Sequence, residues 1–381
     1  MSDAHVNRVT LEQLASLADP NRVRRAREAR SLTQAELAQA VTDLTGHPLS
    51  APAISQIERG STRPSPETLG ALARALGYPP AFFAARLNAT GRPEADPYGF
   101  FRSLRSTSAR DRRSALAHAF LVHDLVVVLE RHIRLPLLDL PKQAVRQGDE
   151  AEAAAAAARM VRAAWSIAPG PVPSVVRRLE RSGIAVARFT TGLDAVDAFS
   201  VNFPDRPVVI LGNDKGKRGR SRFDAAHELG HLVMHDEASG WESIAETQAH
   251  GFAAEFLMPR DDIRPELAAD RLTWRRLVDL KVRWGTSIAA LVRRARDVSV
   301  ITPHEYTNWV KGISARGWRQ DEPGDRELGP PEAPVLLERA VERLEAMGRT
   351  FPTIVSEAGL PLDDLLPIVR ASSDPRPRLD V

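Results

Sequence analysis

Apolar residues recur at helical spacing through most of the chain, with polar residues between them. Residues three and four apart share one face of a helix, so this pattern predicts helices. Residues 22–88 divide into short helical segments with Ser, Thr, Gly or Pro at their joints, and residues 100–168 are helical again. Between them, the breaker-rich stretch NATGRPEADPYG (88–99) predicts a linker.

The pattern changes near residue 174. SVVRRLERSG predicts a helix, and IAVARF (184–189) predicts a strand. AFSVNF and PVVILGN are further short strand-like runs, and together they suit a small antiparallel sheet. These last runs could offer a sheet edge to an extended peptide, or they could simply be core strands. The remainder is predicted as a pair of helices within 220–259, mostly helix over 272–315, a polar exposed connection over 317–334 and a final helical pair over about 335–371.

Composition narrows the choice of chemistry and compartment. The 381-residue chain is long enough for two or three domains, and it contains no cysteine, so a metal ion must be held by His, Asp or Glu. No apolar run approaches the roughly 18 residues of a membrane-spanning helix, and no signal peptide is recognised, so we expect no membrane partner and a cytoplasmic location. The net charge is only +3, so a case for nucleic-acid binding must come from a local motif.

One stretch has the spacing of a metal site. RSRFDAAHELGHLVMH (220–235) places His227, His231 and His235 at successive intervals of four residues, with Glu228 beside the first. On a helix, His227 and His231 share a face and can converge on one ion, while Glu228 can reach a water on that ion without ligating it. Such an arrangement suits a metallohydrolase. His235 is a poor ligand, because it lies about 12 Å along the helix axis from His227.

The following helix offers the third ligand. Glu242, Glu246 and His250 share one face of this helix, and Ala249 and Ala253 permit close packing there. Glu246 is central and carries a carboxylate, so it is the expected ligand. Two imidazoles and one carboxylate leave an open position for catalysis.

RFDAAHELGHLVMH followed by ETQAHGFAAEFLMP resembles the ImmA/IrrE family of zinc-dependent endopeptidases, over roughly residues 170–260. The resemblance implies Zn²⁺ held by His227, His231 and Glu246, with Glu228 as the general base. His250 stands where the family usually has Asn or Asp, and it would either orient a ligand or reach the metal itself. The resemblance also implies a DNA-binding repressor as the protein substrate. Manganese or iron can occupy similar sites.

A second motif lies near the N-terminus. LTQAELAQAV and SAPAISQIERG are typical of a helix-turn-helix, in which Leu37, Ala38, Ile54 and Ile57 would pack together. Thr33 and Glu36 form a predicted capping box, and Ser50 is a predicted N-cap. The candidate DNA contacts are Ala51, Ser55 and Gln56 toward the major groove, Gln34, Arg59 and Arg63 toward phosphates, and Ser50 at the start of the second helix.

Residues 22–84 resemble the Xre/Cro-type helix-turn-helix family through TQAELA, ISQIERG and the P-S-P-E-T-L helix. This resemblance implies a double-stranded DNA operator and a homodimer that reads a palindrome. AVTDLTGHPLSAPA is longer than the usual turn, so either the first helix runs on or a loop bulges. The alternative is a helical interaction domain that does not bind DNA. GRTFPTIVSEAGLPLDDLLPIV near the C-terminus could mimic another helix-turn-helix, but a plain helical hairpin is favoured.

The sequence therefore predicts an α+β fold, mostly α, with a helix-turn-helix bundle, a helical linker region, a zincin-like peptidase domain with a small antiparallel sheet, and C-terminal helices. The predicted boundaries are 1–88, 89–168, 169–315 and 316–381. The expected function is DNA-bound regulation combined with cleavage of a repressor or antitoxin-like protein. The rival is a non-proteolytic repressor whose zinc domain senses a ligand or partner. A third interpretation is self-cleavage in the 88–99 linker.

Overall fold

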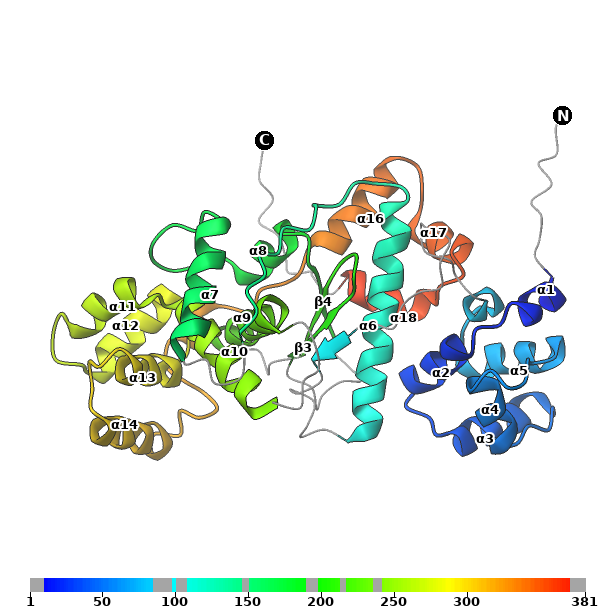
Figure 1. The fold of residues 1–381 in the computed structure, drawn as a ribbon, viewed down its shortest axis with the longest axis horizontal. Coiled ribbons are helices and arrows are strands. Elements are labelled where there is room, and N and C mark those ends of the chain that lie inside the picture. The colour runs from blue at the N-terminus through cyan, green and yellow to red at the C-terminus, as the bar shows by residue number, and fades with distance from the viewer. Residues whose placement is uncertain are drawn as a thin grey trace. The chain divides into compact units, whose positions relative to one another are not determined.

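The computed structural model describes residues 10–84, 98–100, 108–145, 151–189, 198–212, 217–235 and 242–370. By their contacts the residues form two units, and each is described by itself (Figure 1). The first unit joins the N-terminal helices to Ser106–Arg134 and Leu337–Arg370, and the second holds Leu135–Leu336 with Pro97–Arg105. The four domain boundaries predicted from the sequence remain a proposal.

The first unit is helical throughout its described part. Its elements are α1 (Leu11–Ser16), α2 (Pro20–Ala29), α3 (Gln34–Thr45), α4 (Ala51–Glu58), α5 (Pro66–Leu76), the 3-10 helix η1 (Pro80–Phe83), α6 (Ala109–Glu130), α16 (Leu336–Ala346, which begins at the boundary), α17 (Phe351–Glu357) and α18 (Leu362–Arg370). The sequence predicted two helices over about 335–371, and this number was wrong. Thr350 caps a new helix by accepting a hydrogen bond from the Thr353 N–H, so three helices form there.

Helix capping fixes the helix-turn-helix segment. Thr33 and Glu36 form the predicted capping box of α3, and Ser50 accepts a hydrogen bond from the Ala53 N–H at the start of α4. The first helix runs on to Thr45 and ends at Gly46, whose φ of 67° lies in the left-handed region that favours glycine. The unusually long connection is therefore partly an extension of α3.

Apolar packing and one ion pair hold these helices together. The predicted face of Leu37, Ala38, Ile54 and Ile57 is buried, as expected from its helical spacing. On α2, the Arg27 guanidinium donates two hydrogen bonds to Glu58 of α4, with Nε–Oε1 at 2.6 Å and Nη2–Oε2 at 2.8 Å. Both side chains are buried, so each charge depends on the other for its solvation.

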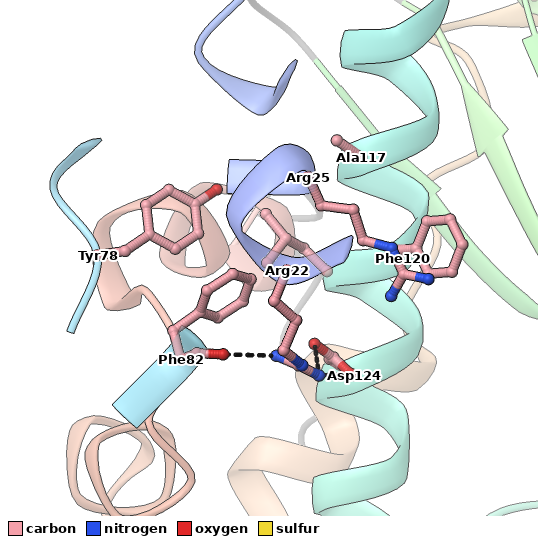
Figure 2. A pocket seen from close by; sticks show the side chains of 8 residues that line it. Arg22, Arg25, Tyr78, Phe82, Ala117, Phe120 and Asp124 are labelled. Atoms are coloured by element: carbon pink, nitrogen blue, oxygen red, sulfur yellow. Dashed lines mark hydrogen bonds and ion pairs between the residues drawn. The ribbon is translucent and has the colours of Figure 1, made fainter. Parts of the chain in front are cut away.

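Further ion pairs join helices that are distant in sequence. Arg22 of α2 contacts both carboxylate oxygens of Asp124 on α6 and donates to the Phe82 carbonyl oxygen at 3.2 Å (Figure 2). Arg30 binds Asp364 of α18 at 2.8 and 3.0 Å. These bonds place α6 and α18 in one unit with the N-terminal helices.

The second unit combines a small sheet with helices. Its elements are β1 (Tyr98–Phe100), α7 (Ala151–Ala164), α8 (Val175–Arg181), β2 (Ala185–Arg188), β3 (Ala198–Asn202), β4 (Val208–Leu211), α9 (Arg218–Met234), α10 (Glu242–Leu257), α11 (Arg260–Ala268), α12 (Trp274–Trp284), α13 (Ile288–Asp297), α14 (Pro303–Ala315) and α15 (Asp325–Leu328). None of the described helices of the chain is both long and apolar enough to cross a membrane.

The sheet is mixed, with strand order β1-β3-β4-β2. β3 pairs antiparallel with β4, as expected for a short hairpin, but β2 pairs parallel with β4. β1 pairs antiparallel with β3, in the register Gly99 to Val201. The predicted strands thus form, and the parallel pair makes the sheet mixed instead of purely antiparallel.

The connection over 317–334 was expected to be exposed, and this was wrong for Glu332 and for the partly buried Glu322, although Asp321 and Glu327 are exposed. Glu332 is buried and binds Arg222 of α9. Glu322 accepts from Lys281 of α12 at 2.8 Å and from the backbone N–H of Ile288. Part of the polar composition of this segment therefore belongs to ion pairs with basic residues that lie far away in sequence.

Candidate metal centre

The site lies where α9 packs against α10 (Figure 1). Gly230, inside the H-E-x-G-H sequence, faces Phe252 of α10, and a Cβ at this position would lie 3.1 Å from that ring. Glycine therefore permits the close approach of the helices. This contact sets the separation across which side chains from α9 and α10 can meet.

Three side chains converge between these helices. The Nε2 atoms of His227 and His231 are 3.0 Å apart. Each lies 3.3 Å from a carboxylate oxygen of Glu246. The structure thus brings together the three residues that the sequence suggested as ligands, with their ligand atoms all within 4.8 Å of one another.

The chemistry of this cluster suits a cation. His227 and His231 are buried, and two imidazole nitrogens that face each other and a carboxylate are the donor set of a His-His-Glu metal site. Partial burial would raise the pKa of Glu246, but the contacts of its carboxylate with His227 and His231 outweigh this effect and lower the pKa. Burial lowers the pKa of His231 to about 4, so its ring is neutral near pH 7, as a metal ligand must be.

Glu228 lies beside this cluster and does not belong to it. Its carboxylate accepts a hydrogen bond of 2.7 Å from the Ser200 hydroxyl on β3. Burial raises the pKa of Glu228 to about 7, although His227 and the Ser200 hydroxyl lower it. A carboxyl group that titrates near neutral pH can both accept and return a proton.

Ser200 was missed in the sequence. Its signal was a single hydroxyl within the otherwise apolar start of AFSVNF, and this hydroxyl is buried. The same strand was considered as a peptide-binding edge. In the described sheet β3 lies between β1 and β4, while β4 lies between β3 and β2, so neither is an edge strand.

Gln248 was also missed as part of the site, whereas His235 was set aside only as a ligand and was considered as a cap of its helix or a neighbour of the cleft. His235 is the C-cap of α9 and lies outside the three-residue cluster, in agreement with its poor position as a ligand. Its Nδ1 lies 3.1 Å from Nδ1 of His231, and its Nε2 lies 3.0 Å from Oε1 of Gln248 on α10. Both side chains are buried.

His250 lies at the margin of the site. Its Nδ1 donates to the Glu246 carbonyl oxygen at 2.8 Å, and its ring packs edge-on against His227 with centroids 4.6 Å apart. Burial of the ring lowers the pKa of His250. The three-residue cluster does not include it, so its geometry fits a neighbour of His227 better than a metal ligand.

The predicted DNA contacts have different surroundings. Ser50, Gln56, Arg59 and Arg63 are exposed, while Ala51, Ser55 and Gln34 are partly buried. Arg59 also donates to the Ser55 carbonyl oxygen at 3.2 Å. The Gln34 amide donates to Glu58 Oε2 at 2.8 Å, so in this structure it turns toward the α2–α4 ion pair.

Comparison with known families agrees with both motifs. Residues 179–296 match the M78 peptidase model described as an IrrE N-terminal-like domain, and residues 23–83 match a helix-turn-helix model. A search of curated proteins gives no match. The fold and the matches define a helix-turn-helix module and a peptidase-type domain. One chain carries both, which confirms the fusion of an Xre-type module to an ImmA/IrrE-type domain that the motifs resembled.

Proposed function

We propose that this protein is a DNA-binding regulator whose second unit is a zinc-dependent endopeptidase. The observation that carries the proposal is the convergence of His227, His231 and Glu246 beside a buried Glu228. The chemistry of this donor set fits zinc, which would supply Lewis acidity for peptide hydrolysis when bound. The substrate would be a repressor or antitoxin-like protein, and the helix-turn-helix would bind a DNA operator as a homodimer.

Glu228 would perform the proton transfers. It would take a proton from the attacking water and pass it to the leaving amine. The Ser200 hydroxyl binds one carboxylate oxygen and so helps to fix the orientation of the group. The raised pKa of Glu228 suits a group that is first a base and then an acid.

Metal content tests the site. Elemental analysis of the purified protein should give about one zinc per chain, and His231→Ala should lose it because two remaining ligands hold zinc weakly. Thr247→Val is the control, since Thr247 is exposed on α10 and its hydroxyl donates to the Ser243 carbonyl oxygen of the same helix. A wild-type protein that stays metal-free after zinc is supplied would contradict the peptidase proposal.

Turnover separates the endopeptidase from the non-proteolytic sensor. Cells that express the wild type or Glu228→Gln would be compared by labelling of new protein N-termini. We expect new termini only with the wild type, and they would identify the substrate. Identical termini in both strains, with zinc bound in both proteins, would favour the sensor.

One observation favours a second candidate, cleavage of the chain's own linker. Tyr98 and Gly99, at the end of the predicted linker, belong to β1, which pairs antiparallel with β3. Its Phe100 is in register with Ser200, the partner of Glu228. Strand addition beside the catalytic group is how a protease holds an extended peptide. Intact mass of purified zinc-loaded protein over time should then show fragments that Glu228→Gln lacks, and an unchanged mass in both would exclude self-cleavage.

A further inference from the structure

A row of hydrogen bonds continues from one ligand histidine into the protein. His231 contributes Nε2 to the ligand cluster, and its other ring nitrogen lies 3.1 Å from Nδ1 of His235. The far nitrogen of His235 lies 3.0 Å from the side-chain oxygen of Gln248. All three side chains are buried, and the row joins the C-terminal end of α9 to α10.

The acceptor at the end of this row determines where each hydrogen lies. The Gln248 carbonyl oxygen can only accept, so Nε2 of His235 carries the hydrogen of their bond. A neutral His235 then has a lone pair at Nδ1, which accepts a hydrogen from Nδ1 of His231. A neutral His231 with its hydrogen on Nδ1 has a lone pair on Nε2, the atom that faces His227 and Glu246.

We infer that His235 and Gln248 are positioning residues that hold His231 in the tautomer and orientation needed to bind a cation through Nε2. This inference rests on the proposed metal site and adds residues that neither motif assigns. The other ligand histidine differs, because Nδ1 of His227 is buried and has no hydrogen-bond partner among the described residues. The row therefore fixes one imidazole of the pair, and Gln248 acts on the metal through two histidines.

The expected effect is on metal affinity. Partners that orient a metal ligand through its second ring nitrogen typically contribute about 10- to 100-fold in affinity. His235→Phe removes the acceptor from His231 and should weaken zinc binding by that range. His235→Asn places an amide oxygen near the former Nδ1 and should restore part of the affinity. Gln248→Met, of similar length but without the amide oxygen, should have a smaller effect in the same direction.

Two measurements test the inference on the full-length protein. The zinc dissociation constant is obtained by competition with a chromophoric chelator for the wild type, the three variants and the Thr247→Val control. Long-range ¹H–¹⁵N correlation spectra of the metal-free protein give the tautomer of His231. We expect hydrogen on Nδ1 in the wild type and in His235→Asn, and a mixture of tautomers in Gln248→Met and His235→Phe.

The outcomes separate this inference from the proposed function. Wild-type affinity in both His235→Phe and Gln248→Met, or hydrogen on Nε2 of His231 in the wild type, would overturn the positioning role. A wild type that binds no zinc would overturn the proposed metal site, and the tautomer spectra would still decide whether the row orients His231. Gln248→Met keeps the question answerable if His235→Phe does not fold.

Discussion

The two functional regions of this protein place their chemical groups in opposite surroundings. In the candidate metal centre these side chains are buried: His227 and His231 contact each other, and Glu228 accepts a hydrogen bond from Ser200. In the helix-turn-helix, candidate contacts such as Gln56 and Arg63 are exposed, and the buried charges lie behind them in the Arg27–Glu58 pair. A single substitution among the buried side chains of the first region should therefore abolish its function directly. In the second region, the substitutions with the largest effect should be those of the buried residues that support the exposed DNA contacts.

The largest expected effect is at Glu228. Glu228→Gln keeps the size of the side chain and an oxygen that can accept from Ser200, but it cannot take a proton. General base catalysis typically contributes about 10²- to 10⁴-fold, so the cleavage rate should fall by that range. The rate would be measured on the substrate identified by its new N-termini. DNA affinity should stay at the wild-type value, and a parallel loss of both would contradict separate roles for the two regions.

The matching change in the helix-turn-helix is at Glu58. Glu58→Ala leaves the buried Arg27 without its bidentate partner. Loss of one member of a buried pair typically costs about 3–5 kcal/mol, so the free energy of unfolding of this region should fall by about that amount. Chemical denaturation followed by circular dichroism measures it. A loss below about 1 kcal/mol would mean that water replaces the carboxylate, as at an exposed pair.

The sequence predicted those features of each region whose interacting residues lie close together in the chain. The His227–His231 pair and the Thr33–Glu36 capping box each lie within one helix, so spacing alone predicted that the members of each pair would be neighbours. Glu246 followed from a second helical pattern. All of these predictions depended on one helix at a time.

Contacts between separate elements could not be predicted in this way. Ser200 reaches Glu228 from a strand 28 residues earlier, and Glu332 reaches Arg222 from 110 residues later. Gln34 has the position of a phosphate contact on α3, but the structure places Glu58 within hydrogen-bond distance. Only the packing of the elements decides these partners, because a local pattern fixes a face of a helix and not what covers it.

The pH dependence of cleavage sharpens the contrast between the buried and the exposed region, because the pKa of Glu228 depends on its burial. Burial raises the pKa of Glu228 to about 7, and the base must be ionised, so cleavage should fall about tenfold per pH unit below that pKa. A bound cation favours the carboxylate, so the acid limb in the zinc-loaded protein should lie at or below pH 7. Ser200→Ala removes a hydrogen bond that lowers this pKa, so the limb should move to higher pH. If Ser200→Ala leaves the acid limb unchanged, the limb does not arise from the ionisation of Glu228.

A smaller effect is expected at the DNA surface. Arg63 is exposed, and if its guanidinium contacts a phosphate, Arg63→Ala should weaken binding to all sequences alike. The slope of log affinity against log salt should become shallower by about 0.9, the value for one phosphate contact. Binding would be measured by fluorescence anisotropy at several salt concentrations. An unchanged slope would remove Arg63 from the interface.

The smallest effect is expected at Gln34, where the sequence and the structure suggest different roles. If Gln34 keeps its bond to Glu58, Gln34→Met removes one hydrogen bond while both Arg27–Glu58 bonds remain. The free energy of unfolding should then fall by only about 0.5–1.5 kcal/mol, with DNA affinity and its salt dependence unchanged. If Gln34 instead swings to a phosphate when DNA binds, affinity should fall without a change in salt slope, because an amide releases no counterion. Comparison of Gln34→Met with Arg63→Ala therefore tells whether a partly buried side chain of this module, and not only an exposed one, takes part in DNA binding.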